Sequence, residues 1–362
     1  MKWEDNILGF VPRKDWLDVP FQITRQGDPI DGLFGDQKTN NLVAEWESLA
    51  SEYQVPMMAQ FHGFDTEAET TFRVPIDTHN IEKGLIKVKI NQSERMRALL
   101  RSGVQGDETL YDYVINDGLR LAEQVVTRTK VAKNEVLATG KLTIKENNLD
   151  LEVDYGVPQA NLALTLDVGD GADDDLPSQL QDIMDTALAN GVTLTGFVTS
   201  GKVVGKMRKN LAIQKAIHGE YGAGQLLSNQ EIRNYLSDEF GLTQVITNDL
   251  TYGASASYGN DGRPAIQTAR YFPKDKVSFI STNVGGNIGV GLWGDPPEMD
   301  SDVQRYLEGN ASGYNPYVWI TQWAENDPAV LWTKASTLFI PVIYNPSALY
   351  VATVTDTPAD GA

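Results

Sequence analysis

The side chains best suited to chemistry in this sequence are acidic, and they are densest in the run 167–175, DVGDGADDD. Closely spaced carboxylates can surround a calcium ion. The run departs from the EF-hand pattern, because Gly169 and Gly171 occupy its third and fifth positions, where oxygen ligands belong. Adjacent acids such as Asp238 and Glu239 could serve hydrolysis, but acids this common pair by chance. We interpret these groups as a solvated linker and wet surface, with a metal site as the less favoured alternative, and predict no cofactor.

Other possible nucleophiles and metal ligands are scattered. His62, His79 and His218 are the only histidines, and none has an H-x-x-x-H or H-E-x-x-H spacing. No G-x-S-x-G nucleophile motif occurs. The glycine-rich run 285–291 resembles a phosphate-binding loop, but the following Leu292–Pro297 cannot supply the helix that such a loop requires, so a tight connection between strands is favoured. We assign no catalytic residue and predict that the chain is not an enzyme.

The composition excludes several classes of function. The absence of cysteine excludes disulfides and thiolate metal sites, so stability beyond the fold must come from packing or from partner subunits. A net charge of −19 repels the phosphate backbone and predicts only non-specific proximity to DNA. No stretch approaches the roughly 20 apolar residues of a membrane span, and the N-terminal sequence lacks a signal-peptide pattern. We therefore expect synthesis in the cytoplasm and no membrane partner.

The first 95 residues predict an arm and a hairpin. Residues 1–60 are rich in aromatics, prolines, glycines and acids, with only 40–53 helical in pattern. An extended arm cannot bury aromatic rings in itself, so they must lie against the body or another subunit. Residues 70–76 and 84–90 predict two paired strands. The second alternates, with three aliphatic residues on one face and Lys87 and Lys89 on the other.

A long helix is predicted over 108–138, with Asp107 as its N-cap and Gly140 at its end. An apolar stripe that includes Leu121 and Val125 runs along it, and we expect Lys130 and Lys133 to fall outside the stripe. A further hairpin is predicted beyond the helix, with strands over 141–146 and 150–155.

After the acidic run, short helices and strands alternate, which predicts a second, mixed domain. The helices are expected over 176–190, 203–217 and 229–240, the last with a capping box of Ser228 and Glu231 and a closing Gly241. Buried strands are expected over 191–198 and 243–247. The strands over 339–343 and 349–355 are expected to rejoin the first domain, which would make the second an insertion.

This order of elements resembles the HK97-type major capsid proteins of tailed phages, and most closely the lambda-like major capsid protein E family. The resemblance covers about Phe61 to Val354. The chain departs from the family pattern in the arm before Phe61 and in 300–315, so no contact is assigned to these two stretches. The segments that carry it are VLATG at 136–140, LEVDYG at 151–156, YFPKDKV at 271–277, VGGNIGVG at 284–291 and the stretch 323–341 with Asp327-Pro328.

The resemblance implies an α+β, HK97-like capsid subunit whose residues 64–92 form an extended loop that reaches over a neighbour. The implied division is an N-terminal arm (1–60), an extended hairpin loop (61–95), a peripheral domain with a long spine helix (96–175), an inserted axial domain (176–322), and returning strands of the peripheral domain with a C-terminal tail (323–362).

The implied function is self-assembly through hexamers and pentamers into the icosahedral head that encloses a phage double-stranded DNA genome, assembled in the bacterial cytoplasm. The implied partners are further copies, a scaffolding protein, a portal and a decoration protein. We expect inter-subunit contacts at Arg73, Lys83, Lys87 and Lys89. Some shells of this fold crosslink a loop lysine to an asparagine, but salt bridging is the better hypothesis here.

Two alternatives remain open from the sequence. Seven tryptophans and many acids would suit a cytoplasmic carbohydrate-active hydrolase, but its tryptophans should converge beside a carboxylate pair. Here three lie in the first 46 residues and three between Trp319 and Trp332. A non-viral nanocompartment shell of the same fold would differ mainly in cargo. The basic segment 202–215 could touch DNA or acidic neighbours, although a solvated helix face is the simpler interpretation.

Overall fold

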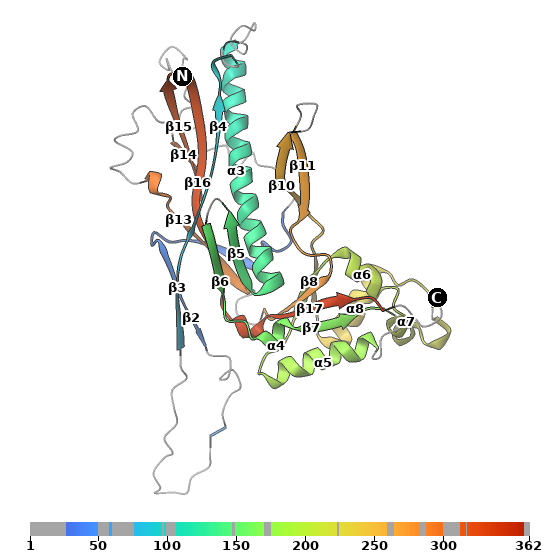
Figure 1. Cartoon of the computed structure of the whole chain (residues 1–362). Coiled ribbons are helices and arrows are strands. Elements are labelled where there is room, and N and C mark those ends of the chain that lie inside the picture. The colour runs from blue at the N-terminus through green and yellow to red at the C-terminus, as the bar shows by residue number, and fades with distance from the viewer. Residues whose placement is uncertain are drawn as a thin grey trace, which may run out of the picture.

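The computed structural model describes residues 27–49, 58–59, 76–95, 98, 106–146, 149–169, 175–222, 224–258, 264–282, 287–299, 312–315 and 317–357. A long helix stands against one sheet, and a second sheet with several short helices lies at the lower end of that helix (Figure 1). The long helix is α3 (Gly106–Thr139). The six-stranded sheet contains β1 (Phe34–Lys38), β13 (Gly289–Gly294), β16 (Ala329–Ile343), β15 (Val318–Asn326), β14 (Ser312–Asn315) and β4 (Gly84–Gln92).

Helix α3 confirms the predicted spine, and its 34 residues make a rod about 50 Å long. Leu121 and Val125 belong to the apolar cluster that α3 forms with β4, β15 and β16. The helix ends where Gly140 takes a φ of 70°, a conformation that favours glycine. Two side chains from the second sheet hold its last carbonyls: Lys276 Nζ donates to Ala138 O at 2.8 Å, and Ser278 Oγ donates to Leu137 O at 2.7 Å.

Strand β4 has the predicted alternation but a different partner. Ile86, Val88 and Ile90 pack against the α3 cluster, while Lys87 and Lys89 are exposed. The strand pairs antiparallel with β16, whereas of the expected partner segment only Ile76 is described, opposite Leu49, and 70–75 lie outside the described residues. The connection expected between the two strands is wrong, because residues 76–82 are themselves a strand that pairs elsewhere in the chain. A period of two shows that one face of a strand is buried but does not say which strand lies beside it.

The hairpin that does form uses β2 (Val43–Leu49) and β3 (Ile76–Glu82), paired from Val43 opposite Glu82 to Leu49 opposite Ile76. This β2–β3 ribbon projects away from the body (Figure 1). The helix expected over 40–53 is wrong in its described part, because Ala44 and Trp46 are buried and the intervening Glu45 is exposed, which is strand alternation. Of the expected loop 64–92, the part that forms β4 lies within the body, and 64–75 lie outside the described residues.

The second sheet has five strands in the order β7 (Leu164–Asp167), β17 (Tyr350–Thr355), β12 (Lys276–Ile280), β8 (Gly196–Thr199) and β9 (Gln244–Thr247). Its core includes Leu180, Phe197, Ile232 and Phe279. The helices of this region are α4 (Gln159–Leu162), α5 (Leu176–Ala189), α6 (Gly201–Met207), α7 (Leu211–His218), α8 (Asn229–Phe240) and the short turns η3 (Glu220–Gly222) and η5 (Pro346–Ala348).

The helices of this region follow their capping residues. Helix α8 has the predicted capping box of Ser228 and Glu231, and it closes at Gly241 with a φ of 68°. The single helix expected over 203–217 is wrong: α6 and α7 are separate, because the Asn210 side chain accepts hydrogen bonds from the first amides of α7.

The returning strands divide between the two sheets. Strand β16 joins β4 and β15 beside α3, whereas β17 lies between β7 and β12 in the five-stranded sheet. Strands β13, β14 and β15, from within 176–322, also belong to the sheet beside α3. Two-stranded ribbons are formed by β5 (Lys141–Glu146) with β6 (Leu149–Asp154), as predicted, and by β10 (Thr251–Tyr258) with β11 (Pro264–Arg270); η4 (Pro297–Met299) is a short turn after β13.

A core substitution tests the packing of α3 on the sheet. Leu121 is 3% exposed, so Leu121→Ala is expected to lower the free energy of unfolding by about 2–5 kcal/mol, measured by urea denaturation of unassembled protein. The matched control is Leu188→Ala on α5, where the side chain is 64% exposed and the expected change is within about 0.5 kcal/mol. Equal losses in both variants would contradict this packing.

Candidate assembly surfaces

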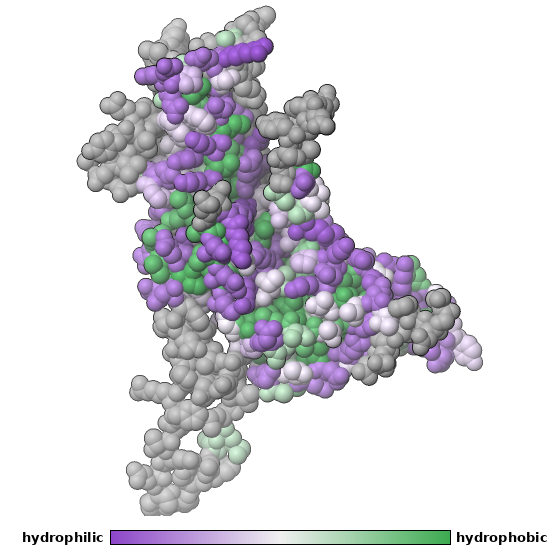
Figure 2. Space-filling view, in the orientation of Figure 1, coloured by the Kyte–Doolittle hydropathy of each residue, from purple (hydrophilic) through white to green (hydrophobic). Residues whose placement is uncertain are grey.

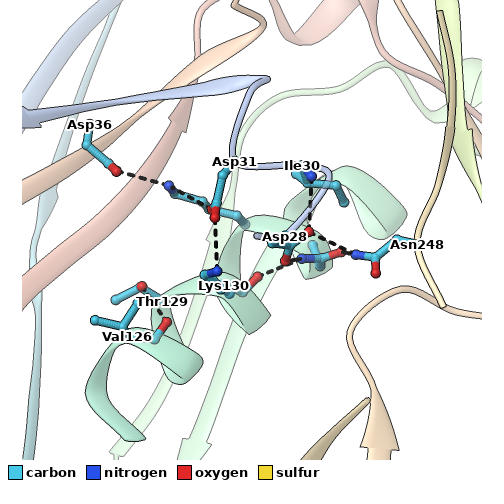
Figure 3. Close-up of polar contacts among 10 residues, drawn as sticks. Asp28, Ile30, Asp31, Asp36, Val126, Thr129, Lys130 and Asn248 are labelled. Atoms are coloured by element: carbon cyan, nitrogen blue, oxygen red, sulfur yellow. Dashed lines mark hydrogen bonds and ion pairs between the residues drawn. The ribbon is translucent and has the colours of Figure 1, made fainter. Parts of the chain in front are cut away.

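A buried polar cluster joins three segments that are far apart in sequence (Figure 3). Asp28 is 5% exposed, and its carboxylate accepts hydrogen bonds from the Ile30 amide at 3.0 Å, from Asn134 Nδ2 at 3.0 Å and from Asn248 Nδ2 at 3.1 Å. Asn248 Nδ2 also donates to Asn134 Oδ1 at 2.9 Å. We call Asp28, Asn134 and Asn248 the polar clip, because they join the chain before β1 to α3 and to the connection between β9 and β10.

Burial governs the ionisation of the polar clip. Loss of solvation raises the pKa of Asp28, and the nearby carboxylate of Asp31 acts in the same direction. Hydrogen bonds from Ile30 and Asn134, together with the charge of Lys130, oppose this rise without cancelling it. The clip therefore holds a carboxyl group whose charged form is less stable in the folded chain than in water.

Two lysines of α3 reinforce the attachment of β1. Lys130 Nζ lies 2.9 Å from Asp31 Oδ2, and Lys133 Nζ lies 2.9 Å from Asp36 Oδ1. The same Asp36 oxygen accepts a hydrogen bond from Trp293 Nε1 at 2.9 Å. Lys130 and Lys133 lie outside the apolar stripe but are buried nonetheless, because the chain before and within β1 covers them and supplies acidic partners.

Lys83 fixes the base of the β2–β3 ribbon. Its side chain is buried, and its ammonium group donates to Thr39 O at 2.9 Å, to Asn41 O at 2.6 Å and to Trp293 O at 3.4 Å. Burial lowers the pKa of Lys83. This amine is occupied within its own chain, so Lys83 has no donor left for a neighbouring subunit.

Lys87 and Lys89 lie on the exposed face of β4. Lys89 Nζ is 4.2 Å from the centre of the Trp332 ring, which itself stacks on Trp323 at 6.1 Å between centroids. Lys87 stands opposite Ser336 in the pairing of β4 with β16. The fourth expected contact residue, Arg73, lies outside the described residues. Of the four expected contact residues, the structure therefore brings Lys87 and Lys89 together on the exposed face of one strand.

An open groove of about 280 Å³ lies beside the beginning of β4. Leu142 and Phe339 in its lining are buried, whereas Leu85 and Leu149 are 41% and 49% exposed. Arg128 lines the groove too and pairs with Glu146 of β5 at 3.3 Å. We call this feature the β4–β6 groove. No sequence pattern predicts this groove, because its lining comes from five separate elements, α3, β4, β5, β6 and β16.

The face shown in Figure 2 is mostly hydrophilic in its described part, with apolar residues gathered in separate patches. The basic segment 202–215 is partly neutralised within the chain, since Lys206 Nζ lies 2.7 Å from Asp356 Oδ2 and Lys215 Nζ lies 3.6 Å from Glu220 Oε2. Of the acidic run, 170–174 lie outside the described residues, and Asp175 caps α5.

The described residues offer no cluster of three or more His, Cys, Asp or Glu side chains suited to a metal ion. None of the helices in the described part of the chain has the length and apolar content needed to cross a membrane.

Comparison with known proteins identifies the family of the chain. A family model described as phage major capsid protein E matches residues 51–354. The chain belongs to this family. The expected family is thereby confirmed, and the family implies a place in the capsid of the virion. No curated protein gave a significant match.

Solved structures support the same fold. A crystal structure from a prophage of E. coli CFT073, described as a capsid protein, has a TM-score of 0.54 at 12% identity and covers 95% of this chain and 99% of its own. A structure of Mycobacterium phage Cain has a TM-score of 0.50 at 12% identity, with coverages of 95% and 94%. The mixed α+β chain therefore has the fold of HK97-like phage capsid proteins, as expected.

The polar clip predicts a specific dependence on pH. A raised pKa means that folding favours protonated Asp28, so its contribution to stability increases as pH falls from neutral through the folded pKa and levels off near the unfolded value of about 4. Wild type should therefore gain stability relative to Asp28→Asn over this range, measured by urea denaturation at a series of pH values. The opposite slope would mean that the three hydrogen bonds outweigh desolvation.

Proposed function

We propose that this phage major capsid protein assembles through hexamers and pentamers into an icosahedral head that encloses double-stranded DNA. The observation that carries the proposal is the β2–β3 ribbon, whose strands pair only with each other among the described strands. Ala44 and Trp46 pack the ribbon on the core of its own chain, and its far end extends away from the body (Figure 1). A two-stranded ribbon is marginal in water by itself. A neighbouring subunit would supply the surface against which the projecting end of the ribbon packs.

The contacts in this proposal combine opposite charges. Glu45 and Glu82 are exposed on the ribbon, whereas Lys87 and Lys89 are exposed on β4 of the body. Complementary charges steer association and fix the register of an interface. We propose that Lys87 and Lys89 make inter-subunit ion pairs with the acidic ribbon of a neighbouring copy, and that Arg73, which lies in sequence between β2 and β3, makes a further contact.

The proposal includes partners beyond the chain itself. Assembly in the bacterial cytoplasm with a scaffolding protein and a portal, and later binding of a decoration protein, would fit a member of this family. The acidic net charge of −19 fits an inner wall that does not trap packaged DNA.

Capsid families of this kind are typically not enzymes, and we propose that this chain has no catalytic activity. A carbohydrate-active hydrolase is disfavoured by the positions of the tryptophans. Trp293 and Trp319 are buried in the six-stranded sheet, at 3% and 4% exposure, and Trp293 packs against Tyr317 and Phe339. Buried rings of this kind stabilise a core and are not accessible to a sugar.

Size-exclusion chromatography and negative-stain electron microscopy of the untagged chain at near-physiological salt test the proposal. We expect closed shells, tubes, or rings of five and six subunits. A monodisperse monomer at high concentration, even with a phage scaffolding protein supplied, would overturn it.

Charge reversal tests the β4 contacts. The double variant Lys87→Glu/Lys89→Glu is expected to raise the protein concentration required for assembly about tenfold or more, measured by sedimentation, because like charges would then face each other across the contact. A factor of ten in concentration corresponds to about 1.4 kcal/mol. Lys274→Glu, which reverses an exposed charge between β11 and β12, is the matched control and should assemble like wild type. Unchanged assembly of the double variant, or equal loss in both, would contradict a role for these lysines.

A further inference from the structure

The β4–β6 groove has the features of a docking site for one or two large side chains. Its volume of about 280 Å³ is near the lower limit of pockets that bind small molecules, roughly 300–1,000 Å³. Leu85 and Leu149 leave apolar surface exposed to water, although each lies beside a buried apolar floor. Burial of such surface would stabilise a complex by about 25 cal/mol per Å².

The rim of the groove favours an acidic occupant. Arg128 already pairs with Glu146, which leaves Lys87 as the positive group of the lining that forms no ion pair within the described part of the chain. A matching ligand would therefore present a large apolar side chain next to a carboxylate. The strand β4 also pairs only with β16 among the described strands, so its other edge offers backbone groups to an extended segment.

The chain before Gly27 carries a sequence with this chemistry. Asp15-Trp16-Leu17-Asp18 places two large apolar residues between two acids. The segment between Asp18 and Gly27 can extend to about 30 Å, so the motif can reach a surface well away from the point where the described chain begins.

The place where the described chain begins, at Gly27, favours docking of the motif in the groove of a neighbouring copy. Asp28 is bound by Asn134, and the adjacent Asp31 pairs with Lys130. The groove is lined by Arg128 and Ala132 of the same helix. Residues two apart on a helix are separated by about 200° around its axis, so these two pairs lie on opposite flanks of α3. To enter its own groove the motif would have to pass around the spine, whereas the groove of another copy requires no such path.

We propose that Trp16 and Leu17 of one subunit dock in the β4–β6 groove of another copy, with Asp15 or Asp18 beside Lys87. This inference rests on the proposed self-assembly and names a contact within it. It assigns the aromatic arm a specific receptor on the body, formed jointly by the spine helix, β4 and the β5–β6 hairpin.

Disulfide trapping tests this contact directly, because the chain contains no cysteine of its own. Particles would be assembled from an equal mixture of a Trp16→Cys chain and a Leu149→Cys chain, oxidised, and analysed on a non-reducing gel. A link between the two variants can then form only between subunits. The control mixture replaces Leu149→Cys with Leu188→Cys, which places the thiol at an exposed leucine of α5, and each single variant is also oxidised alone.

We expect disulfide-linked dimers in the Leu149 mixture and at least about tenfold fewer in the Leu188 mixture and the single variants, as for a contact favoured by about 1.4 kcal/mol or more. Equal dimer formation in both mixtures would overturn the docking proposal. A Trp16→Cys/Leu149→Cys double variant that links only within single chains would overturn the choice of a second copy.

Electron microscopy of the same samples separates the two proposals. Shells that form without the expected link would reject the groove contact and leave the assembly function intact. If even the wild-type chain forms no shells or rings, the assembly function fails and the groove contact fails with it.

A second variant tests the energetic contribution without cysteine. Leu149→Asp places a charge at the groove and is expected to raise the concentration needed for assembly about tenfold or more, whereas Leu188→Asp should leave it unchanged. Both side chains are exposed, so both variants should unfold at the same urea concentration as wild type. Unchanged assembly of Leu149→Asp would overturn the proposal.

Discussion

The packing of α3 against two different sheets is the constraint on which the subunit depends. Along its length, Leu121 and Val125 bury an apolar stripe against the six-stranded sheet. At its end, Lys276 and Ser278 of the five-stranded sheet take up carbonyls that have no partner within the helix. Because a helix is stiff over this length, one element fixes the position of both sheets.

The polar clip makes the path of the chain into β1 specific, and the burial of its polar groups costs solvation energy. Buried charges and amides stabilise little relative to apolar packing, but leaving one of them without its partner is expensive. The arrangement of Asp28, Asn134 and Asn248 therefore permits one path for the chain that enters β1. Together with Lys83 at the ribbon base, it fixes the chain from Asp28 through β1 to the β2–β3 ribbon against the body.

The candidate contacts could be predicted only where they depend on local pattern. The exposed position of Lys87 and Lys89 follows from the alternation of β4, which requires no knowledge of its partner. Lys83 lies just before the same strand but is buried, because the backbone carbonyls of Thr39, Asn41 and Trp293 converge on it from elsewhere. The β4–β6 groove was equally invisible, since no single segment contains its apolar lining.

The sequence by itself determined the spine helix with its glycine stop, the capping box of α8, the β5–β6 hairpin and the family of the chain. These depend on residues within a few positions of one another, or on the order of such elements along the chain. Only the tertiary structure decided that β4 pairs with β16, that β2 is a strand, and that Lys130 and Lys133 are buried. Hydrophobic periodicity shows which face of an element is buried, but strand partners and ion pairs are chosen by segments distant in sequence, whose proximity exists only after folding.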